Sequence, residues 1–146
     1  MRKSIAIVIP SYNEATNIDV LVNALNETVS NLSYDFKFVF VDDGSSDDTI
    51  AILREKSKLQ SNIFYVELSR NFGHQNALKA GIDLVKNDAD AIISMDGDMQ
   101  HPPKIIPKLI QKWEEGYEVV YTIREEDKKL SYFKNKSSNM FYGLMN

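Results

Sequence analysis

The sequence predicts an α/β domain with a mainly parallel sheet and helices on both of its faces. Apolar runs of strand length alternate along the chain with segments whose apolar residues recur at helical spacing. The apolar runs are continuous, which is typical of strands buried on both faces. Because alternating strands and helices are joined by crossover connections, neighbouring strands are expected to run parallel.

The first predicted elements are a strand and the helix that follows it. Residues 5–9 form a continuous apolar run that Pro10 closes, so we expect a central strand here. Beyond it, apolar residues recur three and four positions apart with polar residues between them, which indicates a helix. The apolar positions of this helix are Ile18, Leu21, Val22, Leu25 and Val29.

The same alternation continues to residue 122. Strands are expected at 36–41, 63–68, 91–95 and 118–122, and helices at 49–58, 78–85 and 105–113. The strand at 91–95 is expected to be buried. Pro102 and Pro103 precede the last of these helices, where missing N–H groups cost little. Residues 131–146 indicate an amphipathic helix, for which docking on the core is favoured over a membrane surface or a partner.

Composition limits the class of protein. A length of 146 residues with 43% hydrophobic content predicts one domain, residues 1–146. The net charge of -4 argues against nucleic acid as a partner, since a polyanion is repelled on average. The chain has no cysteine, so any metal must have oxygen or imidazole ligands, and a cytoplasmic location is expected. No apolar run approaches the roughly 20 residues that a membrane-spanning helix needs.

Two carboxylates follow the predicted strand at 91–95. Asp96 and Asp98 are separated by Gly97, which permits a ligand to approach the backbone closely. Hard oxygen ligands of this kind suit Mg²⁺ or Mn²⁺, which keep coordination positions open for phosphate oxygens. Gln100 adds a further polar side chain. The alternative interpretation is that these carboxylates only end a strand and cap the next helix.

The segment Asp42 to Thr49 is a second polar loop after an apolar strand. Its second half has the composition of a turn and a helix cap, so Asp47 or Asp48 is expected to cap and Asp42 or Asp43 to contact a ligand. An EF-hand calcium loop is unsuitable here, because the glycine comes too early and no glutamate closes the loop.

Further polar residues follow the first and the last predicted strands. Tyr12 and Glu14 are candidates for contacts with a base or a ribose, although Glu14 also suits a first helical turn. Arg124 and Lys134 are candidates for binding a diphosphate. The two histidines, His74 and His101, are interpreted as surface or packing residues. The sequence contains neither a G-x-x-x-x-G-K-[ST] loop nor a G-x-G-x-x-G motif.

The ordered motifs resemble those of the family 2 inverting glycosyltransferases, and in particular the polyprenyl-phosphate sugar transferases. The resemblance rests on four segments and covers essentially the whole chain. These are Pro10-Ser11-Tyr12-Asn13-Glu14, the segment from Asp42 to Thr49, Arg70-Asn71-Phe72-Gly73, and the segment from Asp96 to Pro103.

The resemblance implies a GT-A fold, which is a Rossmann-like sheet, and it implies roles for individual residues. The residues implied in nucleotide-sugar binding are Pro10, Tyr12, Glu14, Asp42, Asp43, Asp96, Gly97, Arg124 and Lys134. Asp96, Asp98 and Gln100 are implied in metal binding, and Asp96, Asp98 and Arg124 in catalysis. The family continues with an acceptor-binding segment, and its polyprenyl branch adds membrane helices, so we expect an N-terminal fragment of a longer enzyme.

The expected reaction transfers a sugar from a nucleotide-sugar donor, with UDP-glucose or a similar UDP-sugar favoured, to an acceptor. Polyprenyl phosphate is the favoured acceptor and a saccharide is the alternative. The expected location is the cytoplasm or, for a longer enzyme, the cytoplasmic face of the membrane. Membrane contact would come through the missing C-terminal part or the tail helix. Two other functions remain open. One is a non-catalytic nucleotide-sugar-binding module. The other is a phosphatase of the haloacid-dehalogenase type, in which Asp96 would be the nucleophile.

Overall fold

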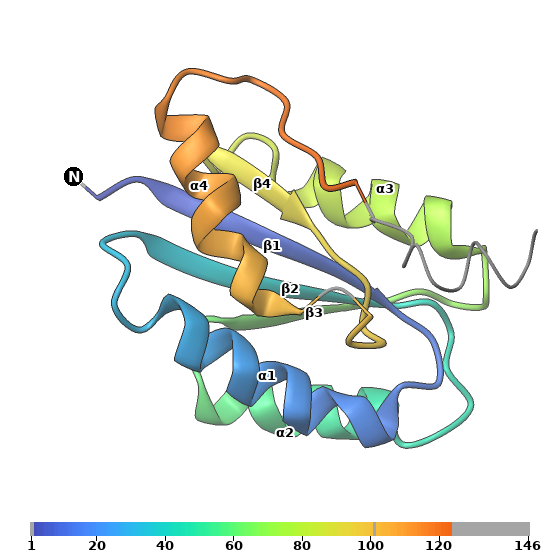
Figure 1. Cartoon of the computed structure of the whole chain (residues 1–146). Coiled ribbons are helices and arrows are strands. Elements are labelled where there is room, and N and C mark those ends of the chain that lie inside the picture. Colours follow the sequence, from blue (N-terminus) through green and yellow to red (C-terminus); the bar gives the residue numbers. More distant parts are fainter. Residues whose placement is uncertain (1, 101, 124–146) are drawn as a thin grey trace, which may run out of the picture. The chain divides into compact units, whose positions relative to one another are not determined.

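The structure, a computed structural model, describes residues 2–100 and 102–123. Strands and helices alternate along them as the sequence predicts (Figure 1). The elements are β1 (Ser4–Ser11), α1 (Ala15–Val29), β2 (Asp35–Asp42), α2 (Thr49–Leu59), β3 (Ile63–Glu67), α3 (His74–Val85), β4 (Ala91–Ser94), the short 3-10 helix η1 (Pro103–Ile105) and α4 (Ile106–Glu114).

The strands form a parallel sheet in the order β3-β2-β1-β4. The chain starts in the middle of the sheet, builds outward through β2 to β3, and returns through α3 to place β4 on the other side of β1. The strand order therefore reverses between β1 and β4. Such a reversal point, at the carboxyl ends of the strands, is where open α/β sheets bind ligands.

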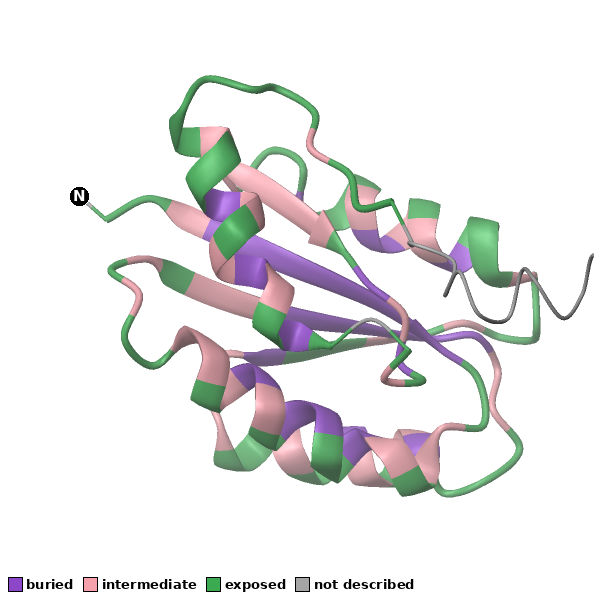
Figure 2. Cartoon of the chain, in the orientation of Figure 1, coloured by how far each residue is buried: buried purple, intermediate pink, exposed green. Residues whose placement is uncertain are grey.

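Both faces of the central strands are covered. Ala6 and Val8 of β1 pack with Ala77 and Val85 of α3. Ile7 and Phe38 point to the opposite face, because side chains alternate along a strand, and they are equally buried. Right-handed crossovers place α1 and α2 on that opposite face (Figure 1). Figure 2 shows the result as a buried centre within a more exposed shell.

Helix α3 lies unusually close to the sheet at Gly81. A Cβ atom at this position would lie 2.4 Å from Val8 Cγ1 and 2.8 Å from Val41 Cγ2. Only a residue without a side chain lets the helix approach β1 and β2 this closely. Gly81 thus sets the distance between α3 and the sheet.

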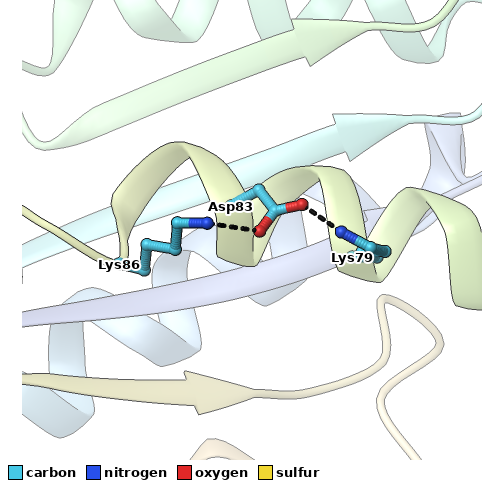
Figure 3. A network of polar contacts seen from close by, with 3 residues as sticks. All are labelled: Lys79, Asp83 and Lys86. Atoms are coloured by element: carbon cyan, nitrogen blue, oxygen red, sulfur yellow. Dashed lines mark hydrogen bonds and ion pairs between the residues drawn. The ribbon is translucent and has the colours of Figure 1, made fainter.

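The opposite side of α3 carries exposed charge. Lys79 and Lys86 both contact Asp83, the latter with its Nζ 2.9 Å from Asp83 Oδ1 (Figure 3). Their hydrogen bonds lower the pKa of Asp83 to about 2, with Lys79 contributing most. Ion pairs this exposed add little to stability, so this network marks the solvent side of the helix.

Two predictions made from the sequence are wrong. The segment 118–122 is not a strand, and it pairs with no strand among the described residues. Its apolar side chains Val119 and Tyr121 are 80% and 77% exposed. The segment therefore lacks the apolar packing that would stabilise it as a strand. The second error concerns β4, which is only partly buried because it is an edge strand of the described sheet.

The chain separates into two compact units, residues 1–111 and 112–146. In the second unit, Lys112 pairs with Glu115 at 2.6 Å and lies over the Tyr117 ring at 5.7 Å. The predicted tail helix at 131–146 falls outside the described residues. No helix in the described ranges is long and apolar enough to cross a membrane.

The close approach at Gly81 gives a prediction with a reversed sign. In the middle of an exposed helix, replacing glycine by alanine usually raises the free energy of unfolding by roughly 0.5–1 kcal/mol. For Gly81→Ala we expect this free energy to fall by about 1–3 kcal/mol, because the added methyl group overpacks the contact with the sheet. Urea unfolding measures the difference. In a Val8→Ala background, which removes the nearest methyl group, the same change should cost less than half as much. A Gly81→Ala chain more stable than the parent would contradict the packing described here.

Candidate functional site

A cleft of about 440 Å³ lies at the carboxyl ends of β1 and β4, where the strand order reverses. Its walls come from the segments that follow β1, β2, β3 and β4, so residues far apart in the sequence meet at one edge of the sheet. The lining residues are Pro10, Ser11, Tyr12, Glu14, Asp43, Asn71, His74, Asp96, Gly97 and Asp98.

The loops after β1 and β2 are joined by hydrogen bonds. Asn13, at a φ of 56°, donates its backbone N–H to Ser45 Oγ at 2.9 Å. Its side-chain oxygen accepts the backbone N–H of Ser46 at 2.8 Å. These reciprocal bonds hold the loop from Pro10 to Glu14 in place, and Tyr12 stands at the cleft with 47% of its surface exposed.

Asp47 and Thr49 extend this connection to the start of α1. The Thr49 hydroxyl accepts the backbone N–H of Glu14 at 2.8 Å and donates to Asp47 Oδ1 at 2.5 Å. Asp47 also accepts the backbone N–H groups of Thr49 and Ala15. Of the two capping candidates, it is Asp47 whose side chain makes these bonds, whereas Asp48 occupies the N-cap position of α2 without one.

These bonds shift the ionisation of Asp47. Burial raises the pKa of Asp47, but the hydrogen bonds from Thr49 and Ala15 lower it by more, so the pKa lies below its usual value. A lowered pKa in the folded state means stability that is present above the unfolded pKa of about 4 and is lost as the pH falls. The interlocked loops should therefore loosen in acid.

Asp43 connects the end of β2 to the start of α3. Its carboxylate is buried, with 3% of the residue exposed, and accepts the backbone N–H of Phe72 at 2.7 Å and that of Gly73 at 2.9 Å. Gly44 lets the two loops touch, because a Cβ there would lie 2.4 Å from the Arg70 carbonyl carbon. Asp43 thus supports the wall of the cleft as well as lining it.

This connection places His74 in the cleft. Gly73 has a φ of 92°, which residues with side chains rarely adopt, and it turns the chain into α3. His74 is the first residue of that helix, and its Nε2 lies 3.4 Å from Asp96 Oδ1. The sequence predicted His74 only as a surface or packing residue; its side chain is half exposed, but it also lines the cleft.

The segment after β4 forms a tight turn. Asp98 Oδ1 accepts the backbone N–H of Gln100 at 3.0 Å, and Met99 between them has a φ of 60°. Gly97 is buried against the first loop, and a Cβ there would meet Ser11 Oγ at 3.4 Å and Glu14 Cγ at 3.6 Å. Asp98 remains exposed on the side of the cleft.

The residues of the cleft fit a divalent cation only in part. Asp96 and Asp98 supply carboxylate oxygens, the ligand type that Mg²⁺ and Mn²⁺ prefer. Among residues 2–100 and 102–123, no group of three or more His, Asp or Glu side chains converges as a complete site. This donor set suits a cation that takes its remaining ligands from bound phosphate and water, which is the usual arrangement for Mg²⁺.

The structure brings most of the sequence-predicted site residues together, although not all. Pro10, Tyr12, Glu14, Asp43, Asp96, Gly97 and Asp98 line the cleft. Glu14 lines the cleft and is the N-cap residue of α1, so it does not lie in the first helical turn. Asp42 and Gln100 do not line the cleft, and Asp42, only 1% exposed, instead accepts the backbone N–H of Ser45. Arg124, Lys134 and His101 lie outside the described residues.

Sequence reasoning omitted three residues that line the cleft, namely Ser11, Asn71 and His74. A usable signal was present for all three, because each lies at or after the end of a strand on the side of the sheet where ligands gather. For His74 the decisive signal is spatial, since Asp96 is 22 positions away along the chain.

A sequence model described as glycosyl transferase family 2 matches residues 6–146. The chain belongs to glycosyltransferase family 2. It is 41% identical over 140 residues to an uncharacterized glycosyltransferase, YkcC, of Bacillus subtilis, covering 96% of this chain and 43% of the relative. It is 37% identical over 142 residues to undecaprenyl-phosphate 4-deoxy-4-formamido-L-arabinose transferase of Edwardsiella ictaluri, covering 97% of this chain and 43% of that protein. The chain thus spans less than half the length of these relatives.

A solved structure shares the fold. The mannosyltransferase PcManGT of Pyrobaculum calidifontis, in complex with GDP-Man and Mn²⁺, superposes with a TM-score of 0.61 at 23% identity. The match covers 77% of this chain and 32% of that one. The predicted GT-A, Rossmann-like sheet of a family 2 glycosyltransferase is therefore confirmed.

The bonds of Asp43 predict a large and specific loss of stability. In Asp43→Asn, the side-chain NH₂ group would face one of the two backbone N–H donors that the carboxylate accepts, those of Phe72 and Gly73. Because two donors cannot bond to each other, we expect the free energy of unfolding to fall by about 2–3 kcal/mol. Asp48→Asn is the matched control, because Asp48 is exposed and its side chain makes no cap hydrogen bond. The control should stay within about 0.5 kcal/mol. Equal stabilities of the two variants in urea titrations would refute the role given to Asp43.

Proposed function

We propose that this chain forms the donor-binding part of an enzyme that transfers a sugar from a nucleotide-sugar to polyprenyl phosphate. The observation that carries the proposal is the meeting of Asp96 and Asp98 with the loop after β1 in one cleft, at the reversal point of a family 2 glycosyltransferase sheet. The proposed domain comprises residues 1–146, and the reaction is proposed to proceed with inversion of configuration.

The cleft offers separate surroundings for the parts of a nucleotide-sugar. Pro10, Tyr12 and Asp43 would contact the base and ribose, with Tyr12 supplying an exposed ring. Asp96 and Asp98 lie where the diphosphate would be held. A volume of about 440 Å³ falls within the usual range of ligand pockets. The resemblance to the polyprenyl-phosphate sugar transferases favours UDP-glucose or a similar UDP-sugar.

Asp96 and Asp98 would hold Mg²⁺ or Mn²⁺ between the protein and the diphosphate. When bound, the cation would supply positive charge that offsets the charge growing on the leaving diphosphate. Gln100 lies outside the cleft lining but in the same turn as Asp98, and it is proposed as a third protein ligand. Arg124 and Lys134 are proposed as further partners of the diphosphate. PcManGT, whose complex holds Mn²⁺ with GDP-Man, supports a divalent cation in a site of this fold.

The acceptor proposal rests on the relatives. A protein 37% identical to this chain is named for transfer to undecaprenyl phosphate. A phosphate acceptor is already anionic near neutral pH, so it can attack the anomeric carbon without a strong general base. Attack from the face opposite the leaving diphosphate would invert the configuration. We therefore propose the cytoplasmic face of a membrane as the location of the whole enzyme, with the lipid phosphate as its acceptor there.

Two alternatives are weaker. The haloacid-dehalogenase interpretation of Asp96 and Asp98 gives no reason for the polar loop from Pro10 to Glu14, and the chain belongs to a different family. A non-catalytic module would bind the donor without turnover, and assay of the chain with polyprenyl phosphate or a saccharide acceptor separates it from an enzyme.

The proposal predicts binding that depends on both the cation and Asp98. Calorimetric titration with UDP, GDP and the matching sugar nucleotides, with and without Mn²⁺, should show one preferred nucleotide in the presence of Mn²⁺. Asp98→Ala should weaken this binding about tenfold or more, which corresponds to ~1.4 kcal/mol.

Asp88→Ala is the control, since Asp88 is exposed and lies outside the cleft lining. It should bind as the parent does. A folded parent chain that binds none of these nucleotides, or an Asp98→Ala chain that binds as tightly as the parent, would reject the proposed donor site.

A further inference from the structure

A histidine faces one of the two acidic residues of the cleft. His74 Nε2 lies 3.4 Å from Asp96 Oδ1, and the two side chains are 50% and 41% exposed. Both residues line the cleft. The proposed function gives a role to Asp96 and none to His74.

The backbone at His74 is fixed independently of Asp96. Asp43 binds the N–H groups of Phe72 and Gly73, which immediately precede the histidine. Helix α3 then packs on β1 and β2, with Gly81 in close contact. His74 therefore projects from a rigid element into the cleft.

Asp96 comes from a less regular part of the chain. It follows β4, an edge strand of the described sheet, and begins the turn that contains Met99 at a positive φ. A donor that contacts one oxygen of a carboxylate fixes the plane of the group and so sets the direction of the other oxygen. His74 is in place to do this for Asp96.

We propose that His74 is a positioning residue that orients the Asp96 carboxylate for the cation and diphosphate of the donor. The inference rests on the proposed function, in which Asp96 serves that part of the ligand. The role needs only an N–H at Nε2, which the imidazole carries in its Nε2-protonated neutral form and in its charged form. His74 acts through Asp96 and needs no contact with the reacting atoms.

The place of the donor atom provides the test. In His74→Gln the amide nitrogen can reach the position of Nε2, in His74→Asn it reaches only that of Nδ1, and His74→Leu keeps bulk without a donor. We expect the affinity for the nucleotide in the presence of Mn²⁺ to fall about tenfold in the Leu and Asn variants and less than threefold in the Gln variant. Nucleotide affinity without the cation should change little in all three, and urea unfolding confirms that each variant is folded.

A second measurement needs no ligand. The chain has two histidines, so ¹⁵N spectra contain two sets of imidazole signals, which His101→Gln assigns. At one fixed pH, Asp96→Asn should move the Nε2 signal of His74, whereas Asp98→Asn should leave it nearly unchanged.

The outcomes distinguish this inference from the function on which it rests. If the parent chain binds the nucleotide with Mn²⁺ and His74→Leu binds equally well, the positioning role is wrong and the donor site stands. The positioning role is also wrong if the His74 signal does not respond to Asp96→Asn. If His74→Gln is as weak as His74→Leu, the imidazole acts otherwise than through an Nε2 donor, which also overturns the inference. If the parent binds no nucleotide, the donor site fails and the role of His74 toward a donor fails with it.

Discussion

The buried carboxylate of Asp43 is the constraint on which the cleft depends. It accepts two backbone N–H groups from the segment before α3 and so ties the end of β2 to the start of that helix. Gly44 permits this contact, and Gly73 directs the chain into the helix. Without the carboxylate, the partly buried N–H of Phe72 would lose its acceptor, and that of Gly73 would keep only Asn71 Oδ1 at 3.0 Å. Such a loss is a substantial fraction of the free energy of unfolding of a marginally stable domain. The wall of the cleft is therefore set by a bond that need not touch any ligand.

The fold was predictable because its signals are local. The continuous apolar run of β1 indicates a strand buried on both faces, and residues 5–9 are fully buried in the structure. The helical spacing of Ile18, Leu21 and Leu25 likewise corresponds to the buried side of α1. The prediction of a strand failed at 118–122, where strand formation depends on pairing with a neighbouring strand. The apolar residues of 118–122 have strand character, but a strand also needs a neighbour, and the sequence of the segment contains no information about one.

The sequence predicted those residues of the candidate site that directly follow a strand. Asp96, Asp98 and the loop from Pro10 to Glu14 were found in this way, because carboxyl ends of parallel strands meet at one edge. The choice between Asp42 and Asp43 was not available from the sequence. Adjacent residues in an extended chain point in opposite directions, and only the three-dimensional structure shows which of the pair faces the cleft. His74 was missed for a related reason. Asp96 is its neighbour in space, but helix α3 and strand β4 separate the two residues along the chain.

The reciprocal bonds between the loops after β1 and β2 limit how such a site can be altered. Asn13 pairs with Ser45 and Ser46, and Thr49 with Glu14, so each loop supplies hydrogen-bond partners to the other. The two loops therefore form a single structural module encoded by two separate stretches of sequence. Recombination or grafting that exchanges one stretch alone would leave unmatched donors in the other. A change of ligand preference by loop exchange would have to transfer both stretches together.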